Sequence, residues 1–227
     1  MANKFVCTLL LLIAAIGAQA DGIVGGTPSS ISAHPYLASL QLADGTIVCG
    51  GALINSKTVV TAASCLANYD VSQFVVGINN GAQTIKIAKS TFNRQYDIET
   101  NENDIAIVKL AEAAIVSSYL ALASSLPSKG LLVGWDKNNA VVQASETIIS
   151  ARKCVTEGYK YEAGDLFNSQ FCGLAENEAC GQLPGSPLVA DNRLLGVVSW
   201  GYGCANKDSP AIYSNVLVLK LWIESVL

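Results

Sequence analysis

Short runs rich in Val, Ile and Leu recur along the chain of 227 residues, separated by turn-forming Gly, Asn, Asp and Ser. Each run is shorter than a typical helix, and its β-branched residues favour an extended backbone. The runs are Tyr36–Leu42, Thr58–Ala62, Phe74–Ile78, Thr84–Ile87, Asp104–Leu110, Val141–Ile149 and Leu194–Trp200. Asp191-Asn192, just before the last run, predicts a hairpin turn. Many short strands predict an all-β barrel or sandwich.

The C-terminus follows a different period. Leu219, Trp222, Ile223 and Val226 are spaced i, i+3, i+4 and i+7, which places them on one face of a helix. Asn215 precedes them and is a suitable N-cap. We therefore expect an amphipathic helix that docks on the body of the protein.

Residues 1–20 are typical of a secretory signal peptide. Lys4 provides the charged start, the run Phe5 to Gly17 is apolar, and Ala18-Gln19-Ala20 fits a small-x-small cleavage site. A membrane anchor is the alternative, but spanning ~30 Å of hydrocarbon takes ~20 apolar residues. We expect a secreted, extracellular protein, with residues 21–22 as a short pro-segment or N-terminal remnant.

The chain has seven cysteines, and Cys7 would leave with the signal peptide. Six cysteines then remain, and an even number of cysteines in an exported chain indicates disulfides. The six are Cys49, Cys65, Cys154, Cys172, Cys180 and Cys204. Zinc is the competing interpretation, but the spacings are wide and His34 is the only histidine. We expect no metal and no cofactor.

The charge pattern excludes several partners. The chain has 14 basic and 18 acidic residues, a net charge of −4, without a basic stripe. Nucleic acid is therefore not an expected partner. Beyond the leader there is no apolar stretch of membrane-spanning length, so a membrane is not expected either.

Several motifs occur in one order along the chain. They are Ile23-Val24-Gly25-Gly26, Cys49-Gly50-Gly51-Ala52-Leu53-Ile54, Val59-Val60-Thr61-Ala62-Ala63-Ser64-Cys65, Asn103-Asp104-Ile105-Ala106, Gly134-Trp135, Ser199-Trp200-Gly201 and Pro210-Ala211-Ile212-Tyr213. Together they resemble the trypsin-like serine proteases of the chymotrypsin fold, in one domain over residues 23–227. The resemblance implies two packed antiparallel β-barrels, a cleft between them, a C-terminal α-helix and a monomer. It also implies the bridges Cys49–Cys65, Cys154–Cys172 and Cys180–Cys204.

The resemblance assigns the catalytic positions to altered residues. That chemistry needs a hydroxyl nucleophile, an imidazole base and a carboxylate that orients the imidazole. Asp104 supplies the carboxylate, but Ser64 stands at the histidine position. A serine hydroxyl is not a base near neutral pH, and we expect His34 to be a structural or surface residue.

The nucleophile motif is altered further. The family pattern Cys-x-Gly-Asp-Ser-Gly-Gly-Pro is matched by the stretch from Cys180 to Pro187, which places Pro184 at the nucleophile. Proline has neither a hydroxyl nor a backbone N–H, so an oxyanion-hole donor is lost as well. Ser186 lies two residues further along, points elsewhere and lacks a base.

Two neighbouring positions also depart from the pattern. Gln182 replaces a glycine that supplies the second oxyanion donor, and Leu183 replaces the aspartate that pairs with a freed Ile23 amine. The basic residue that usually precedes this isoleucine is missing, since Asp21-Gly22 stands there. The resemblance therefore implies a degenerate oxyanion loop and no obvious activation site.

The implied specificity pocket is only partly kept. Glu178 falls where trypsin-like members place the acid that attracts Lys or Arg, and Ser199, Trp200 and Gly201 match a pocket wall. Ala211 replaces a wall glycine, and its methyl group would narrow the pocket. Glu178 is therefore either a substrate-binding residue or a solvated relic.

This combination of a trypsin-like pattern with altered catalytic positions is similar to that of the inactivated serine protease paralogues of the scabies mite. That similarity implies a secreted pseudo-protease that acts by binding, as a host-protein or complement-interacting inhibitor or decoy. The alternative is a serine endopeptidase with residual or unconventional hydrolytic activity.

Overall fold

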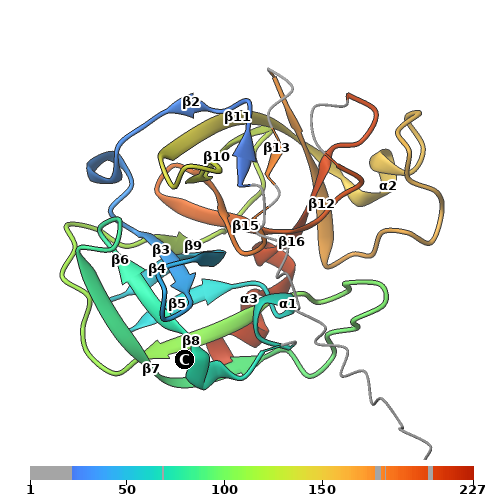
Figure 1. Ribbon diagram of the computed structural model, residues 1–227. Helices are drawn as coiled ribbons and strands as arrows, with labels where there is room; N and C mark the ends of the chain where they lie inside the picture. The colour runs from blue at the N-terminus through green and yellow to red at the C-terminus, as the bar shows by residue number, and fades with distance from the viewer. Residues whose placement is uncertain (1–21, 68, 177–179, 182, 204–206) are drawn as a thin grey trace, which may run out of the picture.

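A computed structural model describes residues 22–67, 69–176, 180–181, 183–203 and 207–227 (Figure 1). The signal peptide prediction, Asp21, Glu178, Gln182 and Cys204 lie outside these residues. Within them, no helix is long and apolar enough to cross a membrane, and no group of three or more His, Cys, Asp and Glu side chains could hold a metal ion.

Six strands of the N-terminal half form a closed antiparallel barrel in the order β3-β4-β5-β8-β7-β6. They are β3 (Leu37–Gln41), β4 (Ile47–Asn55), β5 (Thr58–Thr61), β6 (Val75–Ile78), β7 (Gln83–Phe92) and β8 (Ala106–Leu110). The barrel occupies the lower half of Figure 1. Closure leaves none of these strands with a free edge.

The second barrel is built from β10 (Lys129–Trp135), β11 (Val141–Ser150), β12 (Gln170–Ala175), β14 (Pro187–Ala190), β15 (Arg193–Trp200) and β16 (Ala211–Asn215). β10 pairs with both β14 and β11, which closes the ring. Short strands extend it: β2 (Thr27–Pro28) pairs with β11, and β9 (Ala121–Leu122) runs parallel to β15. β1 (Ile23–Val24) pairs separately with β13 (Cys180–Gly181).

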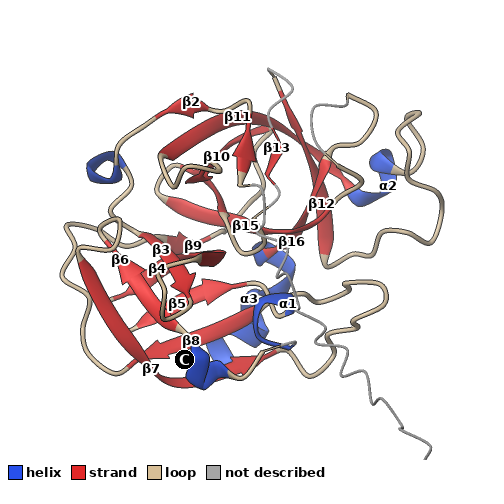
Figure 2. Cartoon of the chain, in the orientation of Figure 1, coloured by secondary structure: helices blue, strands red, loops and turns tan. Residues whose placement is uncertain are grey.

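Helices are few and short, as Figure 2 shows. They are α1 (Ser64–Ala67), α2 (Ala151–Cys154), α3 (Val216–Ser225) and the 3-10 turns η1 (Ile31–Ala33) and η2 (Val71–Gln73). The Asn215 side chain caps α3 by accepting hydrogen bonds from the N–H groups of Leu217 and Val218. The helix follows the second barrel, and its buried residues belong to a hydrophobic cluster that contains residues of both barrels. The predicted helix and cap are confirmed.

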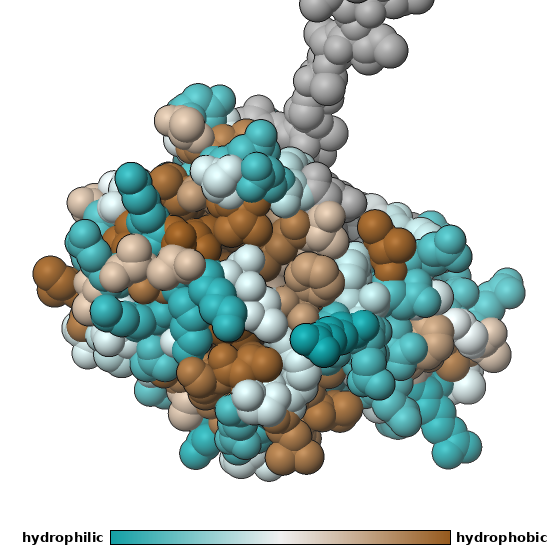
Figure 3. Space-filling view, turned by 90° about the horizontal axis from the view of Figure 1, so that it is seen from below, coloured by the Kyte–Doolittle hydropathy of each residue, from teal (hydrophilic) through white to brown (hydrophobic). Residues whose placement is uncertain are grey.

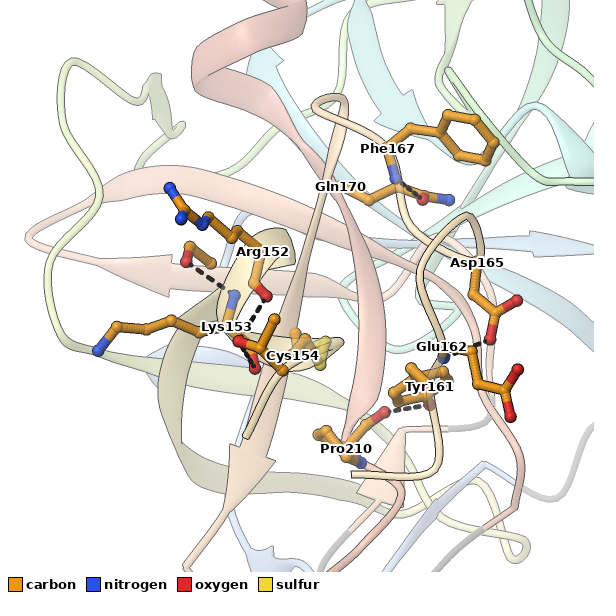
Figure 4. Close-up of a disulfide and its surroundings, with 12 residues drawn as sticks. Arg152, Lys153, Cys154, Tyr161, Glu162, Asp165, Phe167, Gln170 and Pro210 are labelled. Atoms are coloured by element: carbon orange, nitrogen blue, oxygen red, sulfur yellow. Dashed lines mark hydrogen bonds between the residues drawn. A yellow bond between two sulfur atoms is a disulfide. The ribbon is translucent and has the colours of Figure 1, made fainter. Parts of the chain in front are cut away.

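Two of the three expected disulfides are confirmed. Cys49–Cys65 joins β4 to α1, and Cys154–Cys172 joins α2 to β12 (Figure 4). The third expected pair includes Cys204, which lies outside the described residues.

The expected fold of two β-barrels with a C-terminal helix is confirmed, with changes at strand ends. The run Thr84–Ile87 belongs to the longer strand β7, and β8 begins at Ala106, two residues later than predicted. The late start follows from Asn103, whose φ of 56° turns the backbone out of an extended conformation. Asp191 and Asn192 have φ of 49° and 57°, as the predicted hairpin turn requires.

The interior of the second barrel holds one carboxyl group, that of Glu146 on β11, which is 0 % exposed. Neither of its oxygens nor the Tyr213 hydroxyl has a hydrogen-bond partner within the described residues. Burial is the main cause that raises the pKa of Glu146 to about 7. The native state keeps a proton that the unfolded chain releases above its ordinary pKa of 4.5.

This difference predicts that the free energy of unfolding falls between about pH 4.5 and pH 7, by about 3 kcal/mol in all. Below this window both states are protonated, and above it both are ionised. Glu146→Gln should remove this part of the pH dependence, measured by urea unfolding of the oxidised protein at pH 5 and pH 8. Glu176→Gln, at an exposed partner of Lys129, is the control. An unchanged slope in Glu146→Gln would contradict the assignment.

Candidate functional site

Asp104 lies at the junction of the two barrels and is 0 % exposed. It follows β7 in the chain and lies two residues before the start of β8 at Ala106. Its Oδ2 accepts hydrogen bonds from Ser199 Oγ at 2.6 Å and Ser64 Oγ at 3.0 Å, and its Oδ1 accepts from the Ser64 N–H at 2.7 Å. The carboxylate is thus held by residues of both barrels.

Two serines of the second barrel donate hydrogen bonds to Asp104, and the sequence did not indicate these contacts. Ser199 on β15 was expected in a pocket wall, but its hydroxyl is directed at the carboxylate. Ser214 on β16 donates to the Asp104 backbone carbonyl at 2.5 Å and was not singled out. Only the strand pairing of β15 with β16 brings these residues together, so no local sequence signal could have found them.

Burial and hydrogen bonding act in opposite directions on Asp104. Removal from water raises its pKa, while the hydrogen bonds from Ser199 and then Ser64 lower it, and the net direction is upward. The bonds therefore offset only part of the cost of burying the carboxylate.

Ser64 begins α1, next to Cys65, whose disulfide fixes this turn to β4. The Ser64 hydroxyl donates a hydrogen bond to Asp104 Oδ2. The position is partly exposed, whereas the chain's only imidazole, His34, is 5 % exposed. The ring nitrogens of His34 lie 3.0 Å from Tyr36 Oη and 2.9 Å from Gln143 Oε1. The expectation that His34 is structural agrees with these contacts.

Pro184 lies in a turn that packs on β4. Its carbonyl accepts a hydrogen bond from the Gly50 N–H at 2.8 Å. The next residue, Gly185, has φ of 79°, and its N–H donates to the Val198 carbonyl at 2.8 Å. A Cβ on Gly185 would overlap the Gly50 carbonyl, so only glycine fits this turn. Pro184 therefore presents a pyrrolidine ring, with neither a hydroxyl nor an N–H.

Ser186 lies in the protein interior. It is 0 % exposed, and its Oγ has no hydrogen-bond partner within the described residues. A Cβ on Gly50 would lie 2.7 Å from this Oγ, and one on Gly134 would lie 3.0 Å from it. The hydroxyl is thus enclosed between the barrels, which agrees with the expectation that it points away from the nucleophile position.

Leu183 is 2 % exposed and belongs to the same hydrophobic cluster as the first-barrel core. Ile23 is also 2 % exposed, but in a separate cluster of the second barrel. Leu183 is thus a packed core residue. Its neighbour Gln182 lies outside the described residues.

The expected pocket wall is lined by aromatic rings. Trp200 meets Tyr161 and Tyr202 edge-on, with ring centroids 5.5 Å apart in each pair, and Tyr161 stacks on Tyr202 at 5.3 Å. The Tyr161 hydroxyl donates to the Pro210 carbonyl at 2.6 Å, beside Ala211 (Figure 4). Sequence reasoning missed both tyrosines, because the pattern considered only one wall of the pocket.

Gly201 and Ala211, which the resemblance also assigns to the specificity pocket, lie close together. A Cβ on Gly201 would lie 3.7 Å from the Ala211 Cα, which leaves room for a small side chain. Ala211 is 7 % exposed and packs in the second-barrel cluster. Glu178, the proposed acid of the pocket, lies outside the described residues.

Two barrels that meet at a buried aspartate define the chymotrypsin-like class of folds. Residues 23–223 match the sequence model of the family described as Trypsin, so the chain belongs to the trypsin family.

Three of the curated relatives that match are named as trypsins. Trypsin theta of Drosophila melanogaster is 35% identical over 223 residues, covering 88% of this chain and 84% of the relative. Trypsin of Sarcophaga bullata is 33% identical, covering 90% and 89%. Trypsin alpha of Drosophila erecta is 33% identical, covering 98% and 97%. The match thus extends over nearly the whole of each chain.

The bond between Ser199 and Asp104 predicts a stability effect. Ser199→Ala should lower the free energy of unfolding by about 1.5–3 kcal/mol, because a buried carboxylate loses a charge-assisted hydrogen bond. Urea unfolding at pH 7 measures it. Ser225→Ala removes an exposed hydroxyl that bonds to the Trp222 carbonyl, and should change stability by less than about 0.5 kcal/mol. Equal effects of the two variants would show that the buried bond has no special weight.

Proposed function

We propose that the chain is a proteolytically inactive member of the trypsin family that acts by binding another protein. The observation that carries the proposal is the pair of residues at the catalytic positions. Ser64 donates a hydrogen bond to Asp104 where an imidazole would be needed, and Pro184 occupies the nucleophile position.

The magnitudes favour inactivity. Loss of the triad alone leaves roughly 10³–10⁴-fold catalysis over water in working members of the family, through the oxyanion hole and substrate binding. Loss of one oxyanion donor costs roughly 10²–10³-fold more. Pro184 removes the nucleophile and a donor together, and Ser64 removes the base. The remaining rate should be close to that of the uncatalysed reaction.

Fluorophosphonate labelling tests this directly, since the reagent reacts with activated serines. We expect no labelling above a denatured sample, and no cleavage in broad peptide libraries, while a fly trypsin assayed in parallel labels and cleaves. Labelling of any serine in the folded protein would overturn the proposal and favour the alternative, a serine endopeptidase with residual activity. The names of the curated relatives are the observation that keeps this alternative open.

The double revertant Ser64→His with Pro184→Ser should remain at least about 10³-fold below a fly trypsin in kcat/KM. The reason is that the apolar Leu183 packs in the core, and Gln182 still replaces a glycine at the oxyanion position. Peptide hydrolysis by the folded revertant measures this, with circular dichroism as the control for folding. Efficient cleavage would show that the loop tolerates both residues.

The partner that we propose is a host plasma protein, with complement components first among the candidates, and the protein would act in the extracellular space as an inhibitor or decoy. The support is the similarity to the inactivated mite paralogues and the disulfide-linked fold, which suits an exported protein. The surface also carries apolar groups among polar ones on the face shown in Figure 3.

A pull-down from plasma and a complement lysis assay test the partner. We expect capture of a defined plasma protein and inhibition at micromolar concentration. A fly trypsin with its catalytic serine blocked is the matched control, because it presents the same fold with a different surface. Absence of both capture and inhibition, or equal capture by the control, would contradict the proposal. Binding of benzamidine-type ligands would assign the decoy function to the old specificity pocket, and its absence would remove that version.

A further inference from the structure

The N-terminal segment of the domain is docked on the second barrel. Ile23 is 2 % exposed and packs in an apolar cluster that includes Leu132, Val142 and Leu188. Its strand β1 pairs with β13, with Ile23 opposite Gly181 and Val24 opposite Cys180. The side chain and the backbone of this segment are both engaged.

Gly22, which precedes Ile23, is itself buried. Its φ is 71°, a conformation that glycine adopts without strain. A Cβ at this position would overlap the carbonyl oxygen of Trp135 and would lie 2.8 Å from the carbonyl carbon of Asp136. The peptide bond between Gly22 and Ile23 is therefore part of the packed structure.

The residues that follow hold the segment in register. Thr27 and Pro28 pair with β11, the Ser29 N–H donates to the Val141 carbonyl at 2.9 Å, and Ser29 Oγ donates to Gln143 Oε1 at 2.9 Å. A Cβ on Gly26 would lie 3.1 Å from Ile23 Cγ2. The segment thus follows the barrel closely from Gly22 to Ser29.

We propose that this segment docks while the Gly22–Ile23 peptide bond is intact, so that the domain reaches its final structure without release of an α-amino group at Ile23. A cut there would place an ammonium group on Ile23, which is 2 % exposed and packs in a hydrophobic cluster. A buried cation without a partner is costly, and an α-amino group is protonated below about pH 8. Leu183, which packs apolar in the core, has no charge to offset it.

Docking with this bond intact is a matter of assembly and regulation, and it does not depend on whether the protein cleaves or binds. The structural cause of the docked state is Gly22, which has a left-handed conformation and lies close to Trp135. A protease needs several extended, accessible residues at the bond it cuts, and this bond is buried in the docked segment.

Hydrogen exchange of the secreted, full chain provides the first test, after mass spectrometry has established its N-terminus. We expect amides of residues 22–30 to exchange at least about 100-fold more slowly than in the unfolded chain. Fast exchange of this segment in a protein that retains residues 21–22 would overturn the inference. This measurement needs no variant and does not depend on any activity.

A matched pair of variants provides the second test. Gly22→Ala should lower Tm and accelerate exchange in residues 22–30. Gly45→Ala is the control, because Gly45 also has a positive φ, 86°, but no atom lies within 4 Å of a Cβ built there. Equal effects of the two variants on exchange at residues 22–30 would contradict the docking of Gly22.

The third test deletes Asp21 and Gly22 from the precursor, so that the secreted chain begins at Ile23. This form should not gain Tm over the unaltered protein, and its deficit should be larger at pH 6 than at pH 9, where the amine is neutral. A higher Tm or slower exchange in the form that begins at Ile23 would show that release of the amine completes the fold.

Discussion

The carboxylate of Asp104 is a point at which residues of the two barrels meet. Ser64 reaches it from the first barrel and Ser199 from the second, while Ser214 binds the backbone carbonyl of the same residue. A buried carboxylate is stable only where hydrogen bonds replace its lost hydration, so its position depends on both barrels being closed and in register. This requirement is structural, and it is met without an imidazole.

The separation between scaffold and chemistry follows from where the stabilising interactions lie. One hydrophobic cluster contains residues of both barrels and another lies in the second barrel, and the bridges Cys49–Cys65 and Cys154–Cys172 fix the short helices to their strands. Pro184 contributes a carbonyl to Gly50, and Leu183 adds apolar area to the core. Pro184 and Leu183, which the motif resemblance assigns to catalytic and activation positions, thus contribute to the packing between closed barrels.

The sequence predicted most of the fold because its signals are local. Short β-branched runs indicated an all-β fold, and an i, i+3, i+4 pattern capped by Asn215 predicted the helix. The two barrels and the two bridges followed from the resemblance that the ordered motifs carry. The misplaced start of β8 came from a single asparagine with positive φ, which an apolar run does not reveal. The hydroxyls of Ser199 and Ser214 at Asp104, and the rings of Tyr161 and Tyr202, are brought together by pairing between distant strands, so no window of the sequence contains them.

The residues that place this chain in its family differ from those that peptide hydrolysis requires. The match to the trypsin family depends on some two hundred positions, most of which build strands and cores, whereas peptide hydrolysis depends on a few groups with the right atoms. At the two positions that the motif resemblance assigns to the base and the nucleophile, the chain has Ser64, whose hydroxyl donates to a carboxylate, and Pro184, which has no N–H or O–H to donate. Ser186, the nearest remaining hydroxyl, is enclosed by Gly50 and Gly134 and would have to leave a packed interior to reach a substrate. The family match identifies the fold, and the residues at the assigned catalytic positions are the reason for proposing that the chain binds without cutting.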